Sequence, residues 1–481
     1  MAEQMLKFVS VPQRMPDKRP ADQRRRDFGE IYQAFSTDQA AQQSSRCSQC
    51  GVPFCQVHCP LGNNIPDWLK LTAEGRLEEA YETAQATNTF PEICGRICPQ
   101  DRLCEGNCVI EKGFEAVTIG SIEKYITENA FEMGWVKPPK PRRERKESVG
   151  IVGAGPAGLA AADMLRRMGY QVTVYDRYDR VGGLLIYGIP NFKLEKQAVE
   201  RRTKLLVEGG IRFELNCEVG RDVSLATLRD RHAAVLVATG VYRARELAAP
   251  GRELGNIVPA MDYLTASNRT GLGDAVPAFA DGTLDAEGKR VVVIGGGDTA
   301  MDCVRTAVRQ GAKSVQCLYR RDRANMPGSL REVKHAEEEG VEFLWLTQPL
   351  GFRGRTGKLT KLKVQRMKLG LADAAGRAAP KPVEGSEFDL KADLAILALG
   401  FDPEDLPAMF ADPDLAVTRA GTLKIDFRKF ETSLPGVFAA GDIVRGASLV
   451  VWAIRDGRDA AQAMHRYISA RAMSGAALAA E

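Results

Sequence analysis

The sequence lacks a long hydrophobic run and any strong excess of charge of one sign. No stretch of its 481 residues reaches the roughly 18 apolar residues that a membrane-spanning helix requires. The 66 basic and 62 acidic side chains leave a net charge of only +4, which gives no single-sign field of the kind that nucleic-acid binding needs. Met1 to Arg14 contains no apolar signal-peptide core. We therefore expect a cytoplasmic protein with neither a membrane span nor a nucleic-acid partner.

Histidine is scarce as well, with only His58, His232, His335 and His465 present. None of the four lies beside a recognisable nucleophile pattern, so the sequence does not indicate hydrolytic or acid–base catalysis by this chain. The chain is nevertheless long enough for two to four domains, each with its own core. Chemistry on this chain is therefore expected to come from bound cofactors.

Cysteine, in contrast, is plentiful: eight of the eleven cysteines fall between Cys47 and Cys108. Thiols of a cytoplasmic protein stay reduced, so this clustering indicates metal binding rather than disulfides. The two groups follow the spacings Cys47-x2-Cys50-x4-Cys55-x3-Cys59 and Cys94-x3-Cys98-x5-Cys104-x3-Cys108. Each four-iron cluster takes four ligands and prefers thiolate, so the eight cysteines predict two [4Fe-4S] clusters.

Zinc is the alternative metal, but zinc sites favour Cys-x2-Cys pairs on both sides, and only Cys47 and Cys50 form such a pair. Cys59-Pro60 and Cys98-Pro99 resemble the end of ferredoxin motifs, whose last cysteine often binds the other cluster, so we expect the two groups to exchange ligands. His58 is better explained by packing than by metal binding. Three cysteines stand singly within strand or helix patterns and are predicted to be buried structural thiols: Cys217, Cys303 and Cys317.

The cysteine-rich segment is predicted to form short helices, such as Asp67 to Tyr81, between Cys/Gly/Pro loops. It ends in a proline-rich, highly charged run from Lys137 to Lys146, which cannot form a helix and is expected to be solvated. We interpret this run as a linker, and a basic patch that docks a partner is the alternative. A first domain is therefore expected over residues 1–145.

The order strand, Gly-rich turn, helix and strand then occurs twice, at Ser148 to Asp176 and at Arg290 to Arg321. Each unit is followed much later by a short apolar strand that ends in glycine, Val235 to Gly240 and Ala395 to Gly400. An internal duplication of a dinucleotide-binding domain is the simplest explanation.

The first glycine loop reads Gly153-Ala154-Gly155-Pro156-Ala157-Gly158. In this pattern the first glycine makes a tight turn, the second lets the backbone approach a pyrophosphate, and the third lets helix and strand pack closely. About 20 residues later Asp176 ends the next strand, at the position where a carboxylate binds a ribose hydroxyl. Asp176 is therefore a predicted ribose ligand, and an acid at the surface end of a strand is the alternative.

The second glycine loop reads Gly295-Gly296-Gly297-Asp298-Thr299-Ala300, and its second strand ends in Arg320 and Arg321 instead of an acid. A guanidinium pairs with a 2′-phosphate through two parallel hydrogen bonds, whereas a carboxylate would repel it. This loop therefore predicts NADP(H) rather than NAD(H). A solvated Arg-Arg-Asp-Arg turn is the alternative.

Two such units in tandem resemble the glutathione-reductase-like flavoproteins, in which one binds FAD and the other NADPH. Thr432 to Asp442 resembles the second FAD signature of that class, so Asp442 would bind the ribityl or pyrophosphate side of FAD. A helix near Val451 to Ala460 would point its N-terminus at the flavin. The resemblance implies two three-layer α/β Rossmann domains, FAD-binding over 146–251 and 401–481, and NADPH-binding over 252–400. Three further glycines are expected at the FAD: Gly183, Gly240 and Gly441.

Neither nucleotide-binding segment contains Cys-x-x-Cys, so the disulfide relay of thioredoxin or glutathione reductases is missing and electrons must leave by another route. The fused cysteine-rich domain resembles that of the small subunits of NADPH-dependent glutamate synthases. More distantly, it resembles the N-terminal half of dihydropyrimidine dehydrogenase and the large subunit of NADH-dependent ferredoxin:NADP oxidoreductase. Three motifs carry a match that spans essentially the whole chain: Cys94 to Gln100, Tyr187 to Pro190 and Ala447 to Arg455.

This resemblance also implies two ligand sets, one of Cys47, Cys50, Cys55 and Cys108, the other containing Cys59, Cys98 and Cys104. The relatives carry Gln or Glu in the segment that reads Ile119 to Glu123 here, so Glu123 competes with Cys94 for the open position. A carboxylate ligand would leave Cys94 as a structural thiol nearby. We expect Glu123.

The implied activity is that of a small subunit that oxidises NADPH at FAD and passes electrons through both clusters to a large subunit with FMN and its own iron–sulfur cluster. There L-glutamine and 2-oxoglutarate would give L-glutamate, which assimilates ammonia. Residue 2 is Ala and not an N-terminal nucleophile, so the amide chemistry is expected on the other chain. Two alternatives remain: a reductase subunit that feeds ferredoxin or a pyrimidine-reducing partner, and a zinc-stabilised regulator that senses dinucleotides without turnover.

Overall fold

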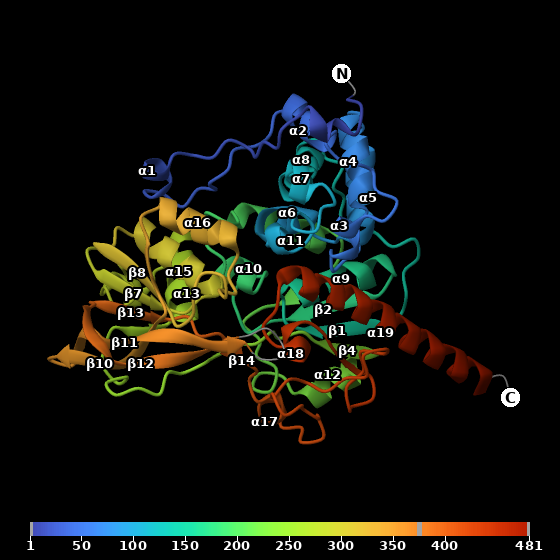
Figure 1. Ribbon diagram of the computed structural model, residues 1–481. Coiled ribbons are helices and arrows are strands. Elements are labelled where there is room, and N and C mark those ends of the chain that lie inside the picture. The colour runs from blue at the N-terminus through green and yellow to red at the C-terminus, as the bar shows by residue number, and fades with distance from the viewer. Residues whose placement is uncertain (1–2, 373–377, 479–481) are drawn as a thin grey trace.

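The computed structural model describes residues 3–372 and 378–478. In Figure 1 a helical N-terminal domain lies above two α/β domains, each of which contains a five-stranded sheet. This arrangement confirms the predicted fold class, a helical domain followed by a pair of Rossmann-type units. Across the described ranges, no helix has both the length and the apolar character needed to cross a membrane.

The N-terminal domain consists of short helices around an apolar core. Ser36 starts the second helix with a capping box, because its hydroxyl accepts the Gln39 N–H and the Gln39 side chain bonds back to the Ser36 N–H. Trp68, Tyr81 and Ile122 are almost fully buried in this core. The helices are α1 (Ala21–Arg24), α2 (Thr37–Ser44), α3 (Phe54–Val57), α4 (Ile65–Ala73), α5 (Leu77–Thr87), α6 (Pro91–Ile97), α7 (Glu111–Phe114) and α8 (Ile119–Glu132).

Two local predictions for this region need correction. The single helix predicted from Asp67 to Tyr81 is wrong, because the chain breaks between α4 and α5 at Gly75, whose φ of 79° lies outside the helical range. The run from Lys137 to Lys146, all of it described, forms no helix or strand, as predicted. It is only partly solvated, however, since the Arg145 N–H donates to the Gly169 carbonyl oxygen.

The first α/β domain has the all-parallel strand order β15-β4-β1-β2-β3. Two helices, α9 and α19, pack on one face of this sheet over Leu159, Leu165 and Ile454, all buried. The strands are β1 (Ser148–Val152), β2 (Gln171–Tyr175), β3 (Arg212–Glu214), β4 (Ala234–Val237) and β15 (Val437–Ala439). The helices are α9 (Pro156–Arg167), α10 (Leu184–Tyr187), α11 (Lys196–Glu208), α12 (Leu225–Arg231), α17 (Leu406–Met409), α18 (Asp442–Arg445) and α19 (Val450–Leu478).

The second α/β domain has the all-parallel order β6-β13-β7-β8-β9, in which β13-β7-β8-β9 repeats the arrangement of β4-β1-β2-β3, as expected of an internal duplication. The outermost strand differs, because β6 precedes its repeat in the chain whereas β15 follows its own. Helices cover one face of the sheet, and an antiparallel three-stranded sheet, β10-β11-β12, covers the other through Phe352, Leu362 and Val364. The strands are β6 (Ile257–Pro259), β7 (Arg290–Ile294), β8 (Ser314–Tyr319), β9 (Glu342–Trp345), β10 (Thr347–Arg355), β11 (Lys358–Ala372), β12 (Ala378–Lys391) and β13 (Leu394–Leu397). The helices are α13 (Ala260–Gly271), α14 (Pro277–Ala280), α15 (Asp298–Arg309) and α16 (Leu330–Glu338).

The chain passes between the two α/β domains twice, and the two crossings lie side by side. β5 (Arg243–Ala244) and β14 (Phe401–Asp402) pair antiparallel, with Phe401 opposite Ala244. The edge strand β15 of the first sheet follows the second crossing, so the second α/β unit is inserted within the first. Both glycine loops therefore come from the same kind of strand-to-helix turn, at the carboxyl end of the central strand of each sheet.

Candidate functional site

The first glycine loop joins β1 to α9 in a conformation that demands glycine at two of its three positions. A Cβ on Gly153, whose φ is 109°, would lie 2.4 Å from the Ala238 carbonyl oxygen, and one on Gly158 would lie 2.0 Å from the Gly153 carbonyl oxygen. A Cβ on Gly155 would meet no atom within 4 Å. Protein contacts thus leave the Gly155 position open, which fits a backbone that a phosphate approaches closely.

Asp176 lies directly beneath this loop at the end of β2. Its Oδ2 accepts the Ala154 N–H at 2.6 Å and its Oδ1 accepts the Tyr178 N–H at 2.9 Å. The side chain is buried, and this burial raises its pKa. The carboxylate therefore holds the glycine loop in place, while each oxygen keeps a second lone pair for a ligand hydroxyl.

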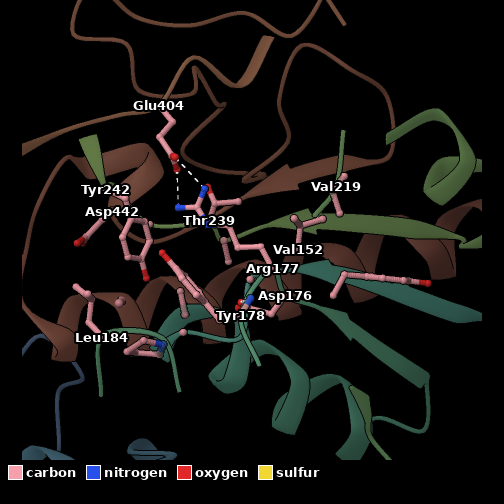
Figure 2. Close-up of a pocket in the computed structure, with 18 of the residues that line it drawn as sticks. Val152, Asp176, Arg177, Tyr178, Leu184, Val219, Thr239, Tyr242, Glu404 and Asp442 are labelled. Carbon is pink, nitrogen blue, oxygen red and sulfur yellow. Dashed lines mark hydrogen bonds and ion pairs between the residues drawn. The ribbon is translucent and has the colours of Figure 1, made fainter. Parts of the chain in front are cut away.

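A cavity runs along this loop and is closed from the other side by the C-terminal segment (Figure 2). Gly183 and Gly441 lie against the loop, because added Cβ atoms would come within 2.9 Å of Gly155 and Ala157 respectively. Asp442, at the start of α18, accepts the Ser448 hydroxyl at 2.6 Å and lines the cavity. The cavity also brings together Pro156, Thr239, Gly240, Leu184 and Val450, the residue that begins α19.

Sequence reasoning missed an ion pair that crosses this cavity. Arg177 Nη1 lies 2.8 Å from Glu404 Oε1, and its guanidinium carbon stands 5.3 Å and 5.1 Å from the ring centres of Tyr178 and Tyr242 (Figure 2). Arg177 follows Asp176 directly, but Glu404 lies 227 residues further along the chain. No local pattern signals such a pair.

Of the three cysteines predicted to be buried structural thiols, two are buried and one is not. Cys303 and Cys317 have no exposed surface. Cys217 is only partly buried and lines the cavity beside the first glycine loop. It follows Asn216, whose φ of 54° turns the chain after β3 across the carboxyl ends of the strands.

The second glycine loop joins β7 to α15 and differs from the first in its third position. A Cβ on Gly295 would lie 2.2 Å from the Ala398 carbonyl oxygen, and one on Gly296 would lie 2.4 Å from the Tyr319 ring. Gly297 again has no atom within 4 Å of an added Cβ, as expected of a phosphate cradle. Ala300 fills the third position and is fully buried. Thr299, which precedes it in the first turn of α15, is half-buried.

Arg320 and Arg321 follow β8 and reach the same edge of the sheet. Arg320 is exposed, and Arg321 is half-buried with its Nε 3.3 Å from the Ala378 carbonyl oxygen. Within residues 3–372 and 378–478, neither arginine pairs with a carboxylate. Arg323, by contrast, is neutralised by Glu337 at 2.7 Å. The turn thus holds two cations without an ion-pair partner among the described residues.

The fold brings four cysteines from both sequence groups together in a first set, Cys47, Cys50, Cys55 and Cys108. Burial raises the pKa of Cys55 to about 12, and repulsion from the other three thiolates adds to the increase. The same two causes raise the pKa of Cys47 to about 11. Four convergent thiols form the donor set that a four-iron cluster prefers.

A second set lines a separate small cavity, where Cys59, Cys94, Cys98 and Cys104 meet Glu123. Glu123 is buried in α8, and its Oε1 accepts the amides of Asn63 at 3.0 Å and Asn88 at 3.1 Å. Burial raises its pKa to about 8. Both candidates for the fourth ligand thus reach the same cavity.

Among the residues described, no three His, Cys, Asp or Glu side chains converge closely enough to hold a single metal ion. Ligands of a four-iron cluster each bind a different iron atom, so they stand further apart than the ligands of one ion. His58 bonds the Phe54 carbonyl oxygen at 3.0 Å through Nδ1 and packs on the Phe54 ring, as expected for a packing residue.

Two family models match the chain in tandem. The one described as dihydropyrimidine dehydrogenase domain II, 4Fe-4S cluster, covers residues 24–135. The one described as pyridine nucleotide-disulphide oxidoreductase covers residues 147–457. The first description names an iron–sulfur cluster, which supports iron over the zinc alternative.

Among curated relatives, the glutamate synthase [NADPH] small chain of Azospirillum brasilense is 67% identical over 480 residues, covering 100% of this chain and 99% of its own. That of Escherichia coli (strain K12) is 46% identical and covers 97% and 100%. Among solved structures, FprA from Mycobacterium tuberculosis in complex with NADPH is similar with a TM-score of 0.58 and 22% identity, covering 69% of this chain and 86% of its own, which shows a shared fold. The chain therefore belongs to the glutamate synthase [NADPH] small chain family, which joins a [4Fe-4S] domain to a pyridine nucleotide-disulphide oxidoreductase unit.

Proposed function

We propose that this chain is the small subunit of an NADPH-dependent glutamate synthase, which oxidises NADPH at FAD and delivers electrons to a large subunit through two [4Fe-4S] clusters. One observation carries the proposal. A central cavity between the domains is lined at once by Cys98 of the second cysteine set, by Asp298 of the second glycine loop, and by Leu449 at the start of α19. Leu184, Ser448, Leu449 and Val450 line both this central cavity and the cavity of the first glycine loop. Three candidate cofactor sites therefore meet in one place.

The residues that would hold each group follow from these positions. FAD would lie along Gly153, Gly155, Pro156, Ala157, Gly158, Asp176, Gly183, Gly240, Gly441 and Asp442. NADPH would lie along Gly295, Gly296, Gly297, Asp298, Thr299, Ala300, Arg320 and Arg321. The corresponding domains would be residues 1–145 for the clusters, 146–251 with 401–481 for FAD, and 252–400 for NADPH.

When bound, NADPH supplies a hydride that FAD accepts, and the clusters carry single electrons onward. The chain's own residues bind and orient. The N-termini of α9 and α15 would face the two pyrophosphates with the positive ends of their helix dipoles. Asp176 would orient a ribose, and Arg320 with Arg321 would pair with the 2′-phosphate. Leu184, Leu449 and Val450 supply apolar surface where the two cavities adjoin.

For the open position of the second cluster we keep Glu123 as the proposed ligand and Cys94 as the alternative. Two amides hold Oε1 of Glu123, which orients the carboxylate within the cavity. Glu123→Leu and Cys94→Ala, neither of which leaves a side-chain donor, are each purified anaerobically and distinguish the two. We expect Glu123→Leu to change the electron paramagnetic resonance spectrum of the reduced second cluster while Cys94→Ala leaves it close to wild type. The reverse pattern would assign Cys94.

The proposed large subunit, which would carry FMN and its own iron–sulfur cluster, needs access to the first cysteine set. Large apolar side chains are exposed in the segments that carry this set, an arrangement typical of protein-binding surfaces: Val52, Phe54, Val57, Val109 and Phe114. These residues support a partner that docks where electrons would leave the chain.

The decisive experiment separates the half-reactions. The purified chain with both cofactor types should reduce an artificial electron acceptor with NADPH, yet make no glutamate from glutamine and 2-oxoglutarate until the large subunit is added. Glutamate formation by the chain alone would contradict the division of labour. Failure to reduce any acceptor with NADPH would contradict the reductase role itself.

A second candidate is a reductase subunit that feeds another acceptor, such as ferredoxin or a pyrimidine-reducing partner. It is favoured by one finding: a putative oxidoreductase of Escherichia coli (strain K12), AegA, is 45% identical over 95% of this chain, which covers 70% of that protein. Co-purification from cells that produce both the chain and the large subunit distinguishes the candidates, since only a synthase subunit should form a stoichiometric complex.

A further inference from the structure

The segment from Arg320 to Ser329 connects the proposed 2′-phosphate site to the start of α16, and its far end is bonded to the second glycine loop. The Gly328 N–H donates to the Gly296 carbonyl oxygen at 3.0 Å, and the Ser329 N–H donates to Asp298 Oδ1 at 3.0 Å. A dinucleotide held by the glycine loop and the arginine pair would therefore act on both ends of this segment.

The same segment contacts the loop between two cysteines of the second set, Cys98 and Cys104. The Ser329 hydroxyl lies 3.1 Å from both carboxylate oxygens of Asp101. Arg331 donates to Gln100 Oε1 at 3.1 Å and to Glu105 Oε2 at 2.5 Å. The Arg102 guanidinium also donates to the Pro327 carbonyl oxygen. Polar contacts from Gln100, Asp101, Arg102 and Glu105 thus join this stretch to the second α/β domain.

The contacts of Ser329 and Arg331 are partly buried, whereas the Arg102 contact is exposed. Ser329 is 4% exposed and Gln100 is 5% exposed. Ser329 precedes α16, where a serine hydroxyl normally caps its own helix, but this hydroxyl makes no cap and is directed to Asp101 instead. Glu105 also accepts the Gly120 N–H at 3.0 Å, which ties the loop to α8. A buried polar group that loses its hydrogen-bond partner costs free energy. A shift of the segment at Ser329 is therefore expected to move the loop at Asp101, and the reverse.

We infer that Ser329 and Asp101 are positioning residues that couple nucleotide occupancy of the second glycine loop to the loop Pro99–Glu105 of the second cluster. The inference rests on the proposed function, because it takes NADP(H) as the ligand of the glycine loop. Bound nucleotide fixes Gly296 and Asp298, these hold Gly328 and Ser329, and Ser329 holds Asp101. By thermodynamic linkage, the factor by which bound nucleotide favours the ordered form of this loop equals the factor by which ordering of the loop raises nucleotide affinity.

Backbone hydrogen exchange of the cofactor-loaded chain, with NADP⁺ as the probe, tests the coupling without turnover. We expect saturating NADP⁺ to slow exchange of the amides between residues 99 and 106 by about fivefold, the low end of typical coupling between sites. Ser329→Ala and Asp101→Ala, each of which removes the hydrogen bond between these side chains, should each weaken this slowing. Ser224→Ala is the matched control, because Ser224 also precedes a helix and its hydroxyl bonds only the hydroxyl and the N–H of Thr227 among the described residues. The slowing should persist in this variant.

Calorimetric titration with NADP⁺ on the same samples separates the possible failures. Binding without any change in exchange at residues 99–106 in the wild type would overturn the coupling and leave the proposed function intact. Slowing that persists unchanged in both Ser329→Ala and Asp101→Ala would overturn the role of these residues. No binding of NADP⁺ would overturn the proposed function, and the coupling with it.

Discussion

The two glycine loops lie in sheets that share the arrangement of four strands, yet the residues at the end of the second of these strands differ in charge and in contacts. In the first, Asp176 turns inward and bonds the backbone of its own loop. In the second, Arg320 and Arg321 extend from the strand end without a carboxylate partner in the described chain. The repeated fold thus contains the same strand–turn–helix loop twice, and the proposed difference in nucleotide between the two copies depends on the residues at one strand end.

The loops also differ in how tightly helix and strand pack. Gly158 in the first loop leaves no room for a methyl group, whereas Ala300 occupies the equivalent position in the second. The Arg177–Glu404 pair lines the cavity beside the first loop, and the second loop is linked to the N-terminal domain through Ser329. Sequence similarity between the copies therefore hides two different surroundings.

The largest effect is expected from Gly158→Ala. The new methyl group would lie 2.0 Å from the Gly153 carbonyl oxygen, so the loop must shift at a cost of about 3 kcal/mol, the upper range for overpacking. We expect purified protein to lose most of its flavin, measured as the ratio of flavin to protein absorbance. Ala300→Gly is the matched change in the other copy and should cost about 1 kcal/mol or less. Full flavin content in Gly158→Ala would contradict the difference between the loops.

The next effect is expected from the double variant Arg320→Ala/Arg321→Ala. Losing two charge-assisted hydrogen bonds to a 2′-phosphate, at about 1.5 kcal/mol each, should raise the KM for NADPH roughly 100-fold. The KM for NADH, which lacks that phosphate, should hardly change. Arg323→Ala removes a nearby arginine that is already paired with Glu337 and should leave both values unchanged. Equal losses for NADPH and NADH would remove the assignment of the 2′-phosphate site.

A moderate effect is expected from Asp176→Asn. The carboxylate accepts two backbone N–H groups, and the amide can accept only one, which leaves a buried donor facing a donor at a cost of about 1–2 kcal/mol. FAD should dissociate about tenfold more readily, as followed by the recovery of free-flavin fluorescence on dilution. Asp281→Asn, which alters an exposed turn, serves as control. Unchanged flavin affinity would show that Asp176 does not shape the loop.

The smallest effect is expected from breaking the ion pair across the first cavity. Arg177 and Glu404 are each about a quarter exposed, so their contribution should be about 1 kcal/mol at most. Arg177→Ala and Glu404→Gln should each weaken FAD binding by no more than about fivefold. The double variant should lose no more than the worse single variant, because both changes remove one interaction. Additive losses would mean that the residues act separately.

Much of the fold and of the candidate sites could be predicted from the sequence, because the signals are local. Glycine spacing after an apolar run predicted both strand–turn–helix loops, and cysteine spacing predicted ligands enough for two clusters. The family resemblance, and not the spacing, predicted which cysteines come together. Local reasoning failed where a single residue interrupts a pattern, as Gly75 does between α4 and α5. It also failed for Cys217, whose burial depends on where the chain turns after β3.

What the sequence by itself determined is the kind of each element: two glycine loops, an acid after one and arginines after the other, and thiols enough for two clusters. Tertiary structure alone decided which distant residues meet. Glu404 reaches Arg177 across 227 positions, Ser329 reaches Asp101 across 228, and both Glu123 and Cys94 reach one cavity. The reason is physical, since backbone preferences and periodicity act between neighbours, whereas contacts between domains depend on how the whole chain packs.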